Sequence, residues 1–383
     1  MNILIAMDSF KGSLSSLEAG MAVSEGIKLV YPEVNAVRLT LADGGEGTME
    51  TLTYGLGGEI VELLVTGPLG EACTAQYGVL PDGTAVIEMA KAAGLPLVPP
   101  SNRNPLYTTT YGVGELIRDA ITKGCRSFIV GIGGSATNDG GIGMLQALGF
   151  EFWDEHGLSC PRGAIGLQYL REIRTEKAMK ELQECRFRIA CDVTTPLFGP
   201  QGCSAIFGPQ KGADTETVSL MDFWLRNYAC KVQELFPFAD PNLPGAGAAG
   251  GLGFAFSVFL GGQLLPGAKM ILDYLRIPEQ LPYYRLIITG EGCLDAQSIM
   301  GKGPVTLARL AKSMNIPVLL FAGCVRDGAE VCKEYGVSAY YHTLPDTLSI
   351  EEAMKPTIAY RNLLNTVKHV MSLQETRDLL KCI

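Results

Sequence analysis

The stretch Ser127–Gly149, SFIVGIGGSATNDGGIGMLQALG, decides how we interpret the fold. Its apolar run Phe128–Val130 predicts a buried strand, and the glycine-rich segment Gly131–Gly141 predicts a turn after it. The apolar segment Ile142–Leu148 then predicts a helix. A strand, a glycine turn and a helix in this order present backbone N–H groups to an anion at the helix N-terminus. The stretch therefore indicates an α/β fold with a phosphate-binding connection.

One acid lies inside this turn. Asp139 would repel a bound phosphate unless a cation stood between the two groups. Mg²⁺ is the simplest such cation, because it binds carboxylate and phosphate oxygens together. We therefore expect a site for a metal and a nucleotide here, rather than a site for a bare phosphate.

The same turn also fits a second motif. Gly131, Gly133 and Ala136 match the G-x-G-x-x-G/A spacing of dinucleotide-binding folds. Asp154 follows about 20 residues later, where an acid would bind the ribose. The match is short, and the polar segment Thr137–Gly141 intervenes where the helix of such a fold would already be apolar. This alternative predicts a nicotinamide-dependent 2-hydroxyacid oxidoreductase.

Length and composition describe a globular protein of two domains. The chain has 383 residues, of which 47% are hydrophobic and 19% are charged. The formal net charge of -9 argues against a nucleic-acid-binding surface. It also makes the binding of an anionic substrate dependent on local positive groups or on a metal. No uncharged apolar run reaches the length of a membrane span.

Histidines and cysteines argue against several kinds of site. The three histidines, His156, His342 and His369, all lie outside the glycine-rich turns. A Ser-His-Asp hydrolase and a histidine-ligated zinc site are therefore not expected. The 11 cysteines form no CxxC pair, which predicts reduced, mostly buried thiols in a cytoplasmic protein. The apolar start of the chain is too short for a signal peptide.

Acids recur in turns that follow apolar strands. We expect such strands at Asn2–Ala6, Val34–Leu41, Phe187–Ala190 and Arg285–Thr289, in addition to Phe128–Val130. The acids are Asp8, Asp43, Glu46, Asp139, Asp192, Glu291 and Asp295, and the lysines in similar turns are Lys11, Lys211 and Lys302. Open α/β sheets bind their ligands at the carboxyl ends of the strands. Phosphoryl transfer needs chiefly positioning and charge neutralisation, so acids, glycines and lysines suffice for it.

An antiparallel block interrupts the alternation of strands and helices. Glu59–Val65, Cys73–Val79 and Thr84–Met89 are strand-like, and the turn at 81–83, Pro-Asp-Gly, predicts that the last two form a hairpin. We therefore expect two α/β domains. Residues 1–66 and 268–383 form a discontinuous Rossmann-like domain with a parallel sheet, and residues 67–267 form an inserted mixed α/β domain.

Eight motifs occur in order along the chain. They are MDSFKGS (7–13), ADGGEGT (42–48), GIGGSATNDGG (131–141), CDVTTPL (191–197), FGPQKGA (207–213), PGAGAAGGLG (244–253), TGEGCLDAQS (289–298) and GKGP (301–304). On these motifs the chain closely resembles the bacterial-type glycerate kinases, the glycerate 2-kinase family that is distinct from P-loop and ribokinase-like kinases. The resemblance implies ATP- and Mg²⁺-dependent phosphorylation of D-glycerate to 2-phosphoglycerate, in the breakdown of glyoxylate, glucarate or galactarate. It also implies two α/β domains with the active site in the cleft between them.

The motifs give positions, and we assign roles to them as hypotheses. Asp192 stands at a strand end beside hydroxyls and is our candidate for the base that deprotonates glycerate, with Lys11 as a second catalytic residue. The candidates for substrate binding are Ser9, Asp43, Glu46 and Lys211. The candidates for nucleotide binding are Gly133, Gly134, Ser135, Thr137, Asp139 and Lys302. Glu291 and Asp295 are the candidates for Mg²⁺ ligands.

Three alternatives stay open at this point. A glycerate 3-kinase would phosphorylate the other hydroxyl and give 3-phosphoglycerate. The oxidoreductase lacks a histidine–carboxylate pair in these turns, and a non-catalytic sensor of hydroxy acids would not need so many acids. We expect a small-molecule substrate and no nucleic-acid or membrane partner, and a homodimer is open.

Overall fold

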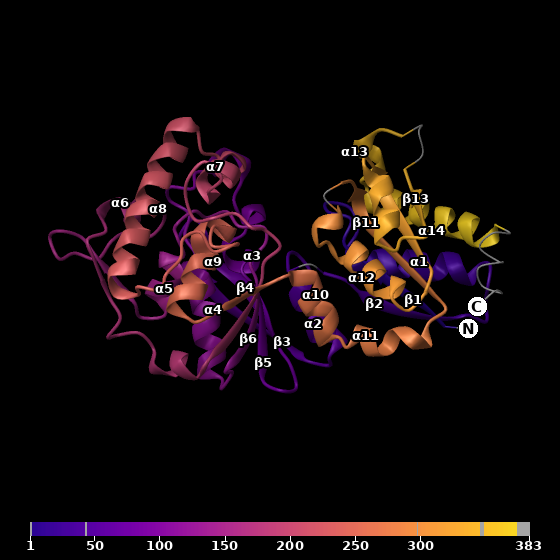
Figure 1. Cartoon of the computed structure of the whole chain (residues 1–383), viewed down its shortest axis with the longest axis horizontal. Coiled ribbons are helices and arrows are strands. Elements are labelled where there is room, and N and C mark those ends of the chain that lie inside the picture. The colour runs from indigo at the N-terminus through magenta and orange to yellow at the C-terminus, as the bar shows by residue number, and fades with distance from the viewer. Residues whose placement is uncertain (1, 43, 297, 345–347, 374–383) are drawn as a thin grey trace. The chain divides into compact units, whose positions relative to one another are not determined.

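The computed structural model describes residues 2–42, 44–296, 298–344 and 348–373. The chain divides into two compact units, one made of Met1–Asp43 and Gly267–Ile383 and the other of Gly44–Pro266. The first unit therefore carries both the indigo start and the yellow end of the chain in Figure 1. We call it the smaller unit, and Gly44–Pro266 the larger unit.

A parallel sheet of five strands forms the centre of the smaller unit. The strands lie in the order β13-β12-β11-β1-β2, and all neighbours are parallel. Their bounds are β1 (Asn2–Met7), β2 (Asn35–Thr40), β11 (Leu286–Leu294), β12 (Val318–Val325) and β13 (Ala339–His342). β1 and β11 are buried over most of their length, which explains the apolar runs at residues 3–7 and 286–288.

The other elements of the smaller unit are mostly helical. They are α1 (Ser16–Lys28), α10 (Gly267–Tyr274), α11 (Ile277–Gln280), η5 (Leu281–Tyr283), η6 (Ser298–Met300), α12 (Gly303–Lys312), η7 (Ala329–Tyr335), α13 (Ile350–Ala353) and α14 (Pro356–Ser372). α1 begins with the capping box that the sequence predicts. The Glu18 N–H donates to the Ser15 hydroxyl (3.2 Å), and the Ser15 N–H donates to the Glu18 carboxylate (2.8 Å). α14 lies against α1, with the Leu364 carbonyl close to Gly26.

A mixed sheet of six strands forms the centre of the larger unit. Its order is β10-β9-β6-β5-β4-β3, in which β5, β6, β9 and β10 are parallel and β3, β4 and β5 are antiparallel. The bounds are β3 (Glu59–Thr66), β4 (Ala72–Val79), β5 (Thr84–Glu88), β6 (Ser127–Gly131), β9 (Arg186–Ala190) and β10 (Gln263–Leu265). The predicted hairpin between β4 and β5 is confirmed, since the Gly83 N–H donates to the Leu80 carbonyl (2.9 Å).

Helices and a two-stranded sheet complete the larger unit. They are α2 (Thr48–Gly55), α3 (Ala90–Ala93), η1 (Leu95–Leu97), η2 (Pro100–Asn102), α4 (Tyr111–Thr122), α5 (Ile142–Ala147), β7 (Glu151–Trp153), α6 (Ile165–Tyr169), β8 (Glu172–Arg174), η3 (Lys180–Glu184), α7 (Cys203–Phe207), η4 (Pro209–Lys211), α8 (Thr215–Leu235) and α9 (Ala248–Phe259). The core of this unit includes Phe128 and Phe187, whose rings stack with centroids 4.7 Å apart. These two side chains come from β6 and β9, so the stack joins neighbouring parallel strands.

The first boundary between the units differs from the expected one. We expected residues 1–66 to belong to the discontinuous domain, but the boundary lies between Asp43 and Gly44. α2 and β3 belong to the larger unit because β3 pairs with β4 along its whole length and α2 packs on β4 and β5. The second boundary lies between Pro266 and Gly267.

The expected fold class is confirmed, with a parallel sheet in one unit and a mixed sheet in the other. None of the described helices is both long and apolar enough to cross a membrane. In both units conspicuous motifs of the sequence lie at the carboxyl ends of parallel strands. MDSFKGS, GIGGSATNDGG and CDVTTPL begin there, and TGEGCLDAQS covers the second half of β11 and the loop after it. These ends are where sheets of this kind bind ligands.

Candidate functional site

The loops after β1 and β11 lie where the sheet of the smaller unit changes direction. The chain continues from β1 to β2 toward one edge, and from β11 to β12 and β13 toward the other. Such a switch point opens a crevice at the carboxyl ends of the strands. A cavity of about 350 Å³ lies here. Its lining includes Asp8, Ser9, Phe10, Lys11, Glu291, Cys293, Lys302, Cys324, Arg326, Met354 and Asn362.

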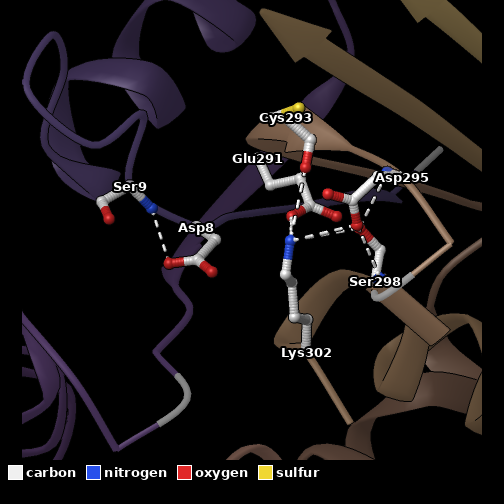
Figure 2. A network of polar contacts seen from close by, with 7 residues as sticks. All are labelled: Asp8, Ser9, Glu291, Cys293, Asp295, Ser298 and Lys302. Carbon is white, nitrogen blue, oxygen red and sulfur yellow. Dashed lines mark hydrogen bonds and ion pairs between the residues drawn. The ribbon is translucent and has the colours of Figure 1, made fainter. Parts of the chain in front are cut away.

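The Lys302 amine is the centre of a polar network in this cavity (Figure 2). It forms an ion pair with the Glu291 carboxylate, with 2.7 Å between Nζ and Oε2. It also donates to the Ser298 hydroxyl (3.2 Å) and lies 3.9 Å from the Asp295 carboxylate. The Ser298 N–H donates to this same Asp295 carboxylate (3.1 Å). The Lys302 cation therefore links Glu291 of β11 to Asp295 and Ser298 in the segment that leads to α12.

Glu291 is the most buried acid of this network. Burial raises the pKa of its carboxyl, and the Lys302 cation opposes the shift. Burial alone lowers the pKa of Lys302, but Glu291, Asp295 and Cys293 together outweigh it, so the pKa of Lys302 is raised. The second carboxylate oxygen of Glu291, Oε1, is buried and has no hydrogen-bond partner among the described residues. Since an unpaired buried acceptor is costly, this atom is available to accept a hydrogen bond from water or to bind a ligand.

Glu291 and Asp295 fit a Mg²⁺ ion that is bound together with a phosphate. Mg²⁺ takes oxygen ligands, commonly one or two carboxylates with the rest from phosphates and water. Within the described residues, no three His, Cys, Asp or Glu side chains are grouped so that they could hold a metal ion by themselves. Glu291 and Asp295 could therefore supply only part of the oxygen ligands of such an ion.

Four residues from the prediction share this cavity. They are Ser9, Lys11, Glu291 and Lys302, and Asp295 joins them through its ion pair with Lys302. The structure adds two residues to which we gave no role. Asp8 is buried and accepts the Ser9 N–H (2.6 Å), and Arg326 lines the cavity from the end of β12. In the sequence, Asp8 and Arg326 could have been recognised by their position directly after an apolar strand.

In the larger unit, three parallel strands end at the same level. Glu88 on β5 lies opposite Gly131 on β6, which lies opposite Ala190 on β9. The turn before α2 reaches this edge as well. A Cβ at Gly44 would overlap the Ala190 side chain, and the Gly133 N–H donates to the Gly44 carbonyl (3.4 Å). Parts of ADGGEGT, GIGGSATNDGG and CDVTTPL therefore meet at one edge.

Asp139 is fully buried beneath the glycine turn. Its carboxylate accepts hydrogen bonds from the N–H and hydroxyl of Thr110 (both 2.9 Å) and from the N–H groups of Gly141 (3.0 Å) and Gly143 (3.3 Å). Burial raises its pKa, and these hydrogen bonds oppose the shift. The carboxylate thus caps the first turn of α5. These contacts give Asp139 a structural role, and the expected contact of this turn with a nucleotide phosphate stays a prediction.

Lys211 is a buried brace of the same turn. Only 2% of the residue is exposed, and its amine donates to the Ser135 hydroxyl (2.9 Å) and the Thr137 carbonyl (2.6 Å). Burial lowers the pKa of Lys211 to about 8. These contacts give Lys211 a structural role in the turn, and the predicted contacts of Ser135, Thr137 and Lys211 with ligands stay predictions. Of the predicted residues in this turn, Gly133 and Gly134 reach the surface.

The PGAGAAGGLG motif supports the turn from behind. The expected tight turn before a helix is present as the non-helical start of α9 at 249–251. The Gly140 N–H donates to the Gly250 carbonyl (2.9 Å), and a Cβ at Gly250 would overlap the Thr137 carbonyl. Gly250 also has a φ of 68°, a conformation that other residues adopt rarely. Two glycine-rich segments therefore pack backbone against backbone.

Two of the predicted acids in the larger unit face solvent. Asp192 lies in the loop after β9, and Glu46 lies in the turn before α2. Both side chains are exposed, so a substrate could reach them. Asp43, another acid that we assigned to substrate binding, lies outside the described residues.

Glu88 is a buried acid that stabilises the start of α2, and we predicted no role for it from the sequence. It is buried, and its Oε1 accepts the Met49 N–H (2.7 Å) in the first turn of α2, whose N-cap residue Gly47 makes no side-chain cap. Burial raises the pKa of Glu88 to about 7; Glu50 adds to the shift, and Lys91 opposes it. In the sequence, Glu88 could have been recognised in the same way as the predicted site acids, because it is an acid at the end of a buried strand.

The dinucleotide-binding alternative is not supported. α5 begins only at Ile142, after the polar segment, and has six residues. The Asp154 carboxylate accepts the N–H groups of His156 and Leu158 (both 2.8 Å), so it shapes a turn after β7. It is not held ready for a ribose.

Replacing Glu88 by Gln should change how stability depends on pH. A raised pKa stabilises the folded protein below about pH 4.5, and this contribution is lost as the pH rises through 7. Because Gln stays neutral, the stability of Glu88→Gln relative to the parent should rise between pH 5 and 8, by on the order of 2 kcal/mol. Urea unfolding at several pH values measures this. Glu62→Gln, an exposed site on β3, is the control, and equal pH profiles for Glu88→Gln and the parent would contradict the assignment.

Replacing Lys302 by Met should destabilise the protein by on the order of 2 kcal/mol, because the buried Glu291 loses its cation. Adding Glu291→Leu should restore part of the loss. Lys231→Met is the matched control, since its ion pair with Glu234 (2.8 Å) lies at the surface and should contribute less than about 1 kcal/mol. Urea unfolding gives these values, and equal losses in the two lysine variants would mean that Lys302 does not organise this edge.

Comparison with known proteins identifies the family. A model of the glycerate kinase family matches residues 3–375. The chain is 43% identical to a glycerate kinase of Haemophilus influenzae, over 97% of this chain and 98% of that protein. It is 42% identical to a glycerate 2-kinase of Escherichia coli, over 97% of each protein. A crystal structure from Salmonella typhimurium LT2, described provisionally as glycerate kinase 2, matches 99% of both chains with a TM-score of 0.87 and 42% identity. The chain therefore belongs to the glycerate kinase family.

Proposed function

We propose that this kinase transfers the γ-phosphoryl group of ATP to the 2-hydroxyl of D-glycerate, with Mg²⁺, and releases 2-phosphoglycerate. The observation that carries the proposal is the match over nearly the whole chain to an Escherichia coli protein named glycerate 2-kinase. The site geometry agrees with it, because strand-end lysines and acids supply what phosphoryl transfer requires. We also propose that the protein acts in the cytoplasm, where the free cysteines of the described chain stay reduced.

The smaller unit supplies the groups for the phosphates. Lys11 and Lys302 neutralise the charge of the transferred phosphoryl group, and Ser9 donates a hydrogen bond beside them. Glu291 and Asp295 hold Mg²⁺, which neutralises phosphate oxygens when it is bound. The ion pair with Lys302 fixes Oε2 of the Glu291 carboxylate, and Oε1 stays available to bind Mg²⁺. Since these groups are positioned before the substrate arrives, little reorganisation is needed in the reaction.

The larger unit supplies the groups for the acceptor. Asp192 takes the proton from the 2-hydroxyl of glycerate, which its exposed place after β9 permits. Glu46 binds the hydroxyls of glycerate, and Gly133 and Gly134 offer backbone contacts to anionic oxygens. Two buried residues support these groups without contacting the substrate. Lys211 stabilises the glycine turn, and Glu88 stabilises the start of α2.

The product of D-glycerate, ATP and Mg²⁺ should be 2-phosphoglycerate. Its ³¹P NMR spectrum should contain a proton-coupled doublet, because the phosphate is attached to a CH group. Removal of Mg²⁺ with a chelator should abolish turnover, and added Mg²⁺ should restore it. A triplet from a CH₂ ester would mean that the 3-hydroxyl is the acceptor. The absence of any phosphate transfer to glycerate would contradict the proposed activity.

Asp192→Asn should lower kcat by about 100-fold or more, because the amide cannot accept the hydroxyl proton. The KM for glycerate should change little, since the amide keeps the size of the carboxyl group. Asp240→Asn, at an exposed turn of the same unit, is the matched control and should keep the kcat of the parent. Steady-state kinetics with a coupled ADP assay measures both constants, and a kcat near that of the parent would show that another group is the base.

A further inference from the structure

The lining of the cavity in the smaller unit combines two chemically different sets of side chains. The charged set is Asp8, Lys11, Glu291, Lys302 and Arg326. The apolar set, which we call the apolar wall, comes largely from α13 and the start of α14 and comprises Ile350, Ala353, Met354 and Ala359, with Leu344 and Phe10. An occupant that matches both sets carries an anionic group and a flat or apolar group.

Glycerate does not match the apolar wall of the cavity. Every carbon of this small acid carries an oxygen, so it has no apolar surface to bury. The cavity volume of about 350 Å³ lies in the range of about 300–1,000 Å³ that is typical of pockets for much larger ligands. The apolar wall would therefore contribute nothing to glycerate binding. A nucleotide has both parts, an aromatic base and a chain of phosphates.

We propose that this cavity is the nucleotide site, with the base against Met354 and Ala353 and the phosphates at Lys302 and Arg326. Met354 is flexible and polarisable, which suits contact with an aromatic ring. Asn362 from α14 offers one donor and one acceptor group, the pair that the edge of adenine requires. The proposal rests on ATP as the donor in the proposed function, and it leaves the glycine turn of the larger unit without a role in binding the base.

The charged groups of the glycine turn agree with this division. The Asp139 carboxylate and the Lys211 amine are occupied by contacts within the larger unit. By contrast, Glu291 in the smaller unit keeps a buried carboxylate oxygen without a partner among the described residues. Glu291 therefore differs from Asp139 in having an oxygen available to a ligand, while the neutral Thr137 hydroxyl and Asn138 side-chain oxygen of the glycine turn are also unpaired among those residues.

Two cysteines give a test that needs no mutation. Cys293 and Cys324 line the cavity on adjacent strands, whereas Cys230 on α8 is exposed and serves as the internal control. Burial raises the pKa of Cys293, so alkylation with iodoacetamide is followed at pH 9. Peptide mass spectrometry should find that saturating Mg·ADP slows alkylation of Cys293 and Cys324 at least fivefold, with Cys230 unaffected. Protection by D-glycerate and not by ADP, or no protection by either, would overturn the proposal.

A variant with a larger side chain at the apolar wall gives a second test, in which ADP affinity is measured. Ala353→Phe should weaken ADP binding at least tenfold in isothermal titration calorimetry. Leu220→Phe, at an exposed position of α8 in the larger unit, is the control and should bind ADP like the parent. Unchanged ADP binding by Ala353→Phe would overturn the proposal. The test is separate from the proposed function: if the parent binds ADP, loses it in Ala353→Phe and does not phosphorylate glycerate, then the acceptor is wrong and the nucleotide site stands.

Discussion

Parallel strand pairing in a fixed register is the constraint on which both candidate sites depend. In the smaller unit Met7 lies opposite Gly290, and the Asp8 N–H donates to the Gly290 carbonyl (2.9 Å). In the larger unit Glu88 lies opposite Gly131. Segments far apart in the sequence thereby end at one level, and their polar turns meet. A slip of one residue would turn every side chain of a strand to the other face and separate these groups.

Burial decides which of the charged residues serve the structure and which can serve a ligand. Lys211 and Lys302 both hold a glycine-rich connection, but only 2% of Lys211 is exposed, against 32% of the Lys302 side chain. The first is surrounded by its own unit, and the second faces a cavity. The same distinction separates Asp139, whose oxygens are taken by backbone and hydroxyl groups, from Glu291, which keeps one unpaired oxygen within the described chain.

Local patterns predicted the elements, because their causes are local. The capping box at Ser15 and Glu18, the hairpin turn before β5 and the buried strands all follow from neighbouring residues. The role of Asp139 could not be predicted in this way, since its main partner Thr110 lies 29 positions earlier in the sequence. The boundary near residue 43 likewise depends on which sheet β3 joins, and the burial of Lys211 depends on its long-range contacts. The sequence located the candidate loops and could not separate the residues that support them from those that face a ligand.

A crystal structure of the protein with Mg²⁺, ADP and D-glycerate tests the central claim most directly. The account predicts electron density for the base beside Met354 in the smaller unit, with the phosphates within hydrogen-bond distance of the Lys302 amine. It also predicts a metal ion on Glu291. Density for the base in the glycine turn of the larger unit, or glycerate alone in the cavity, would contradict the account.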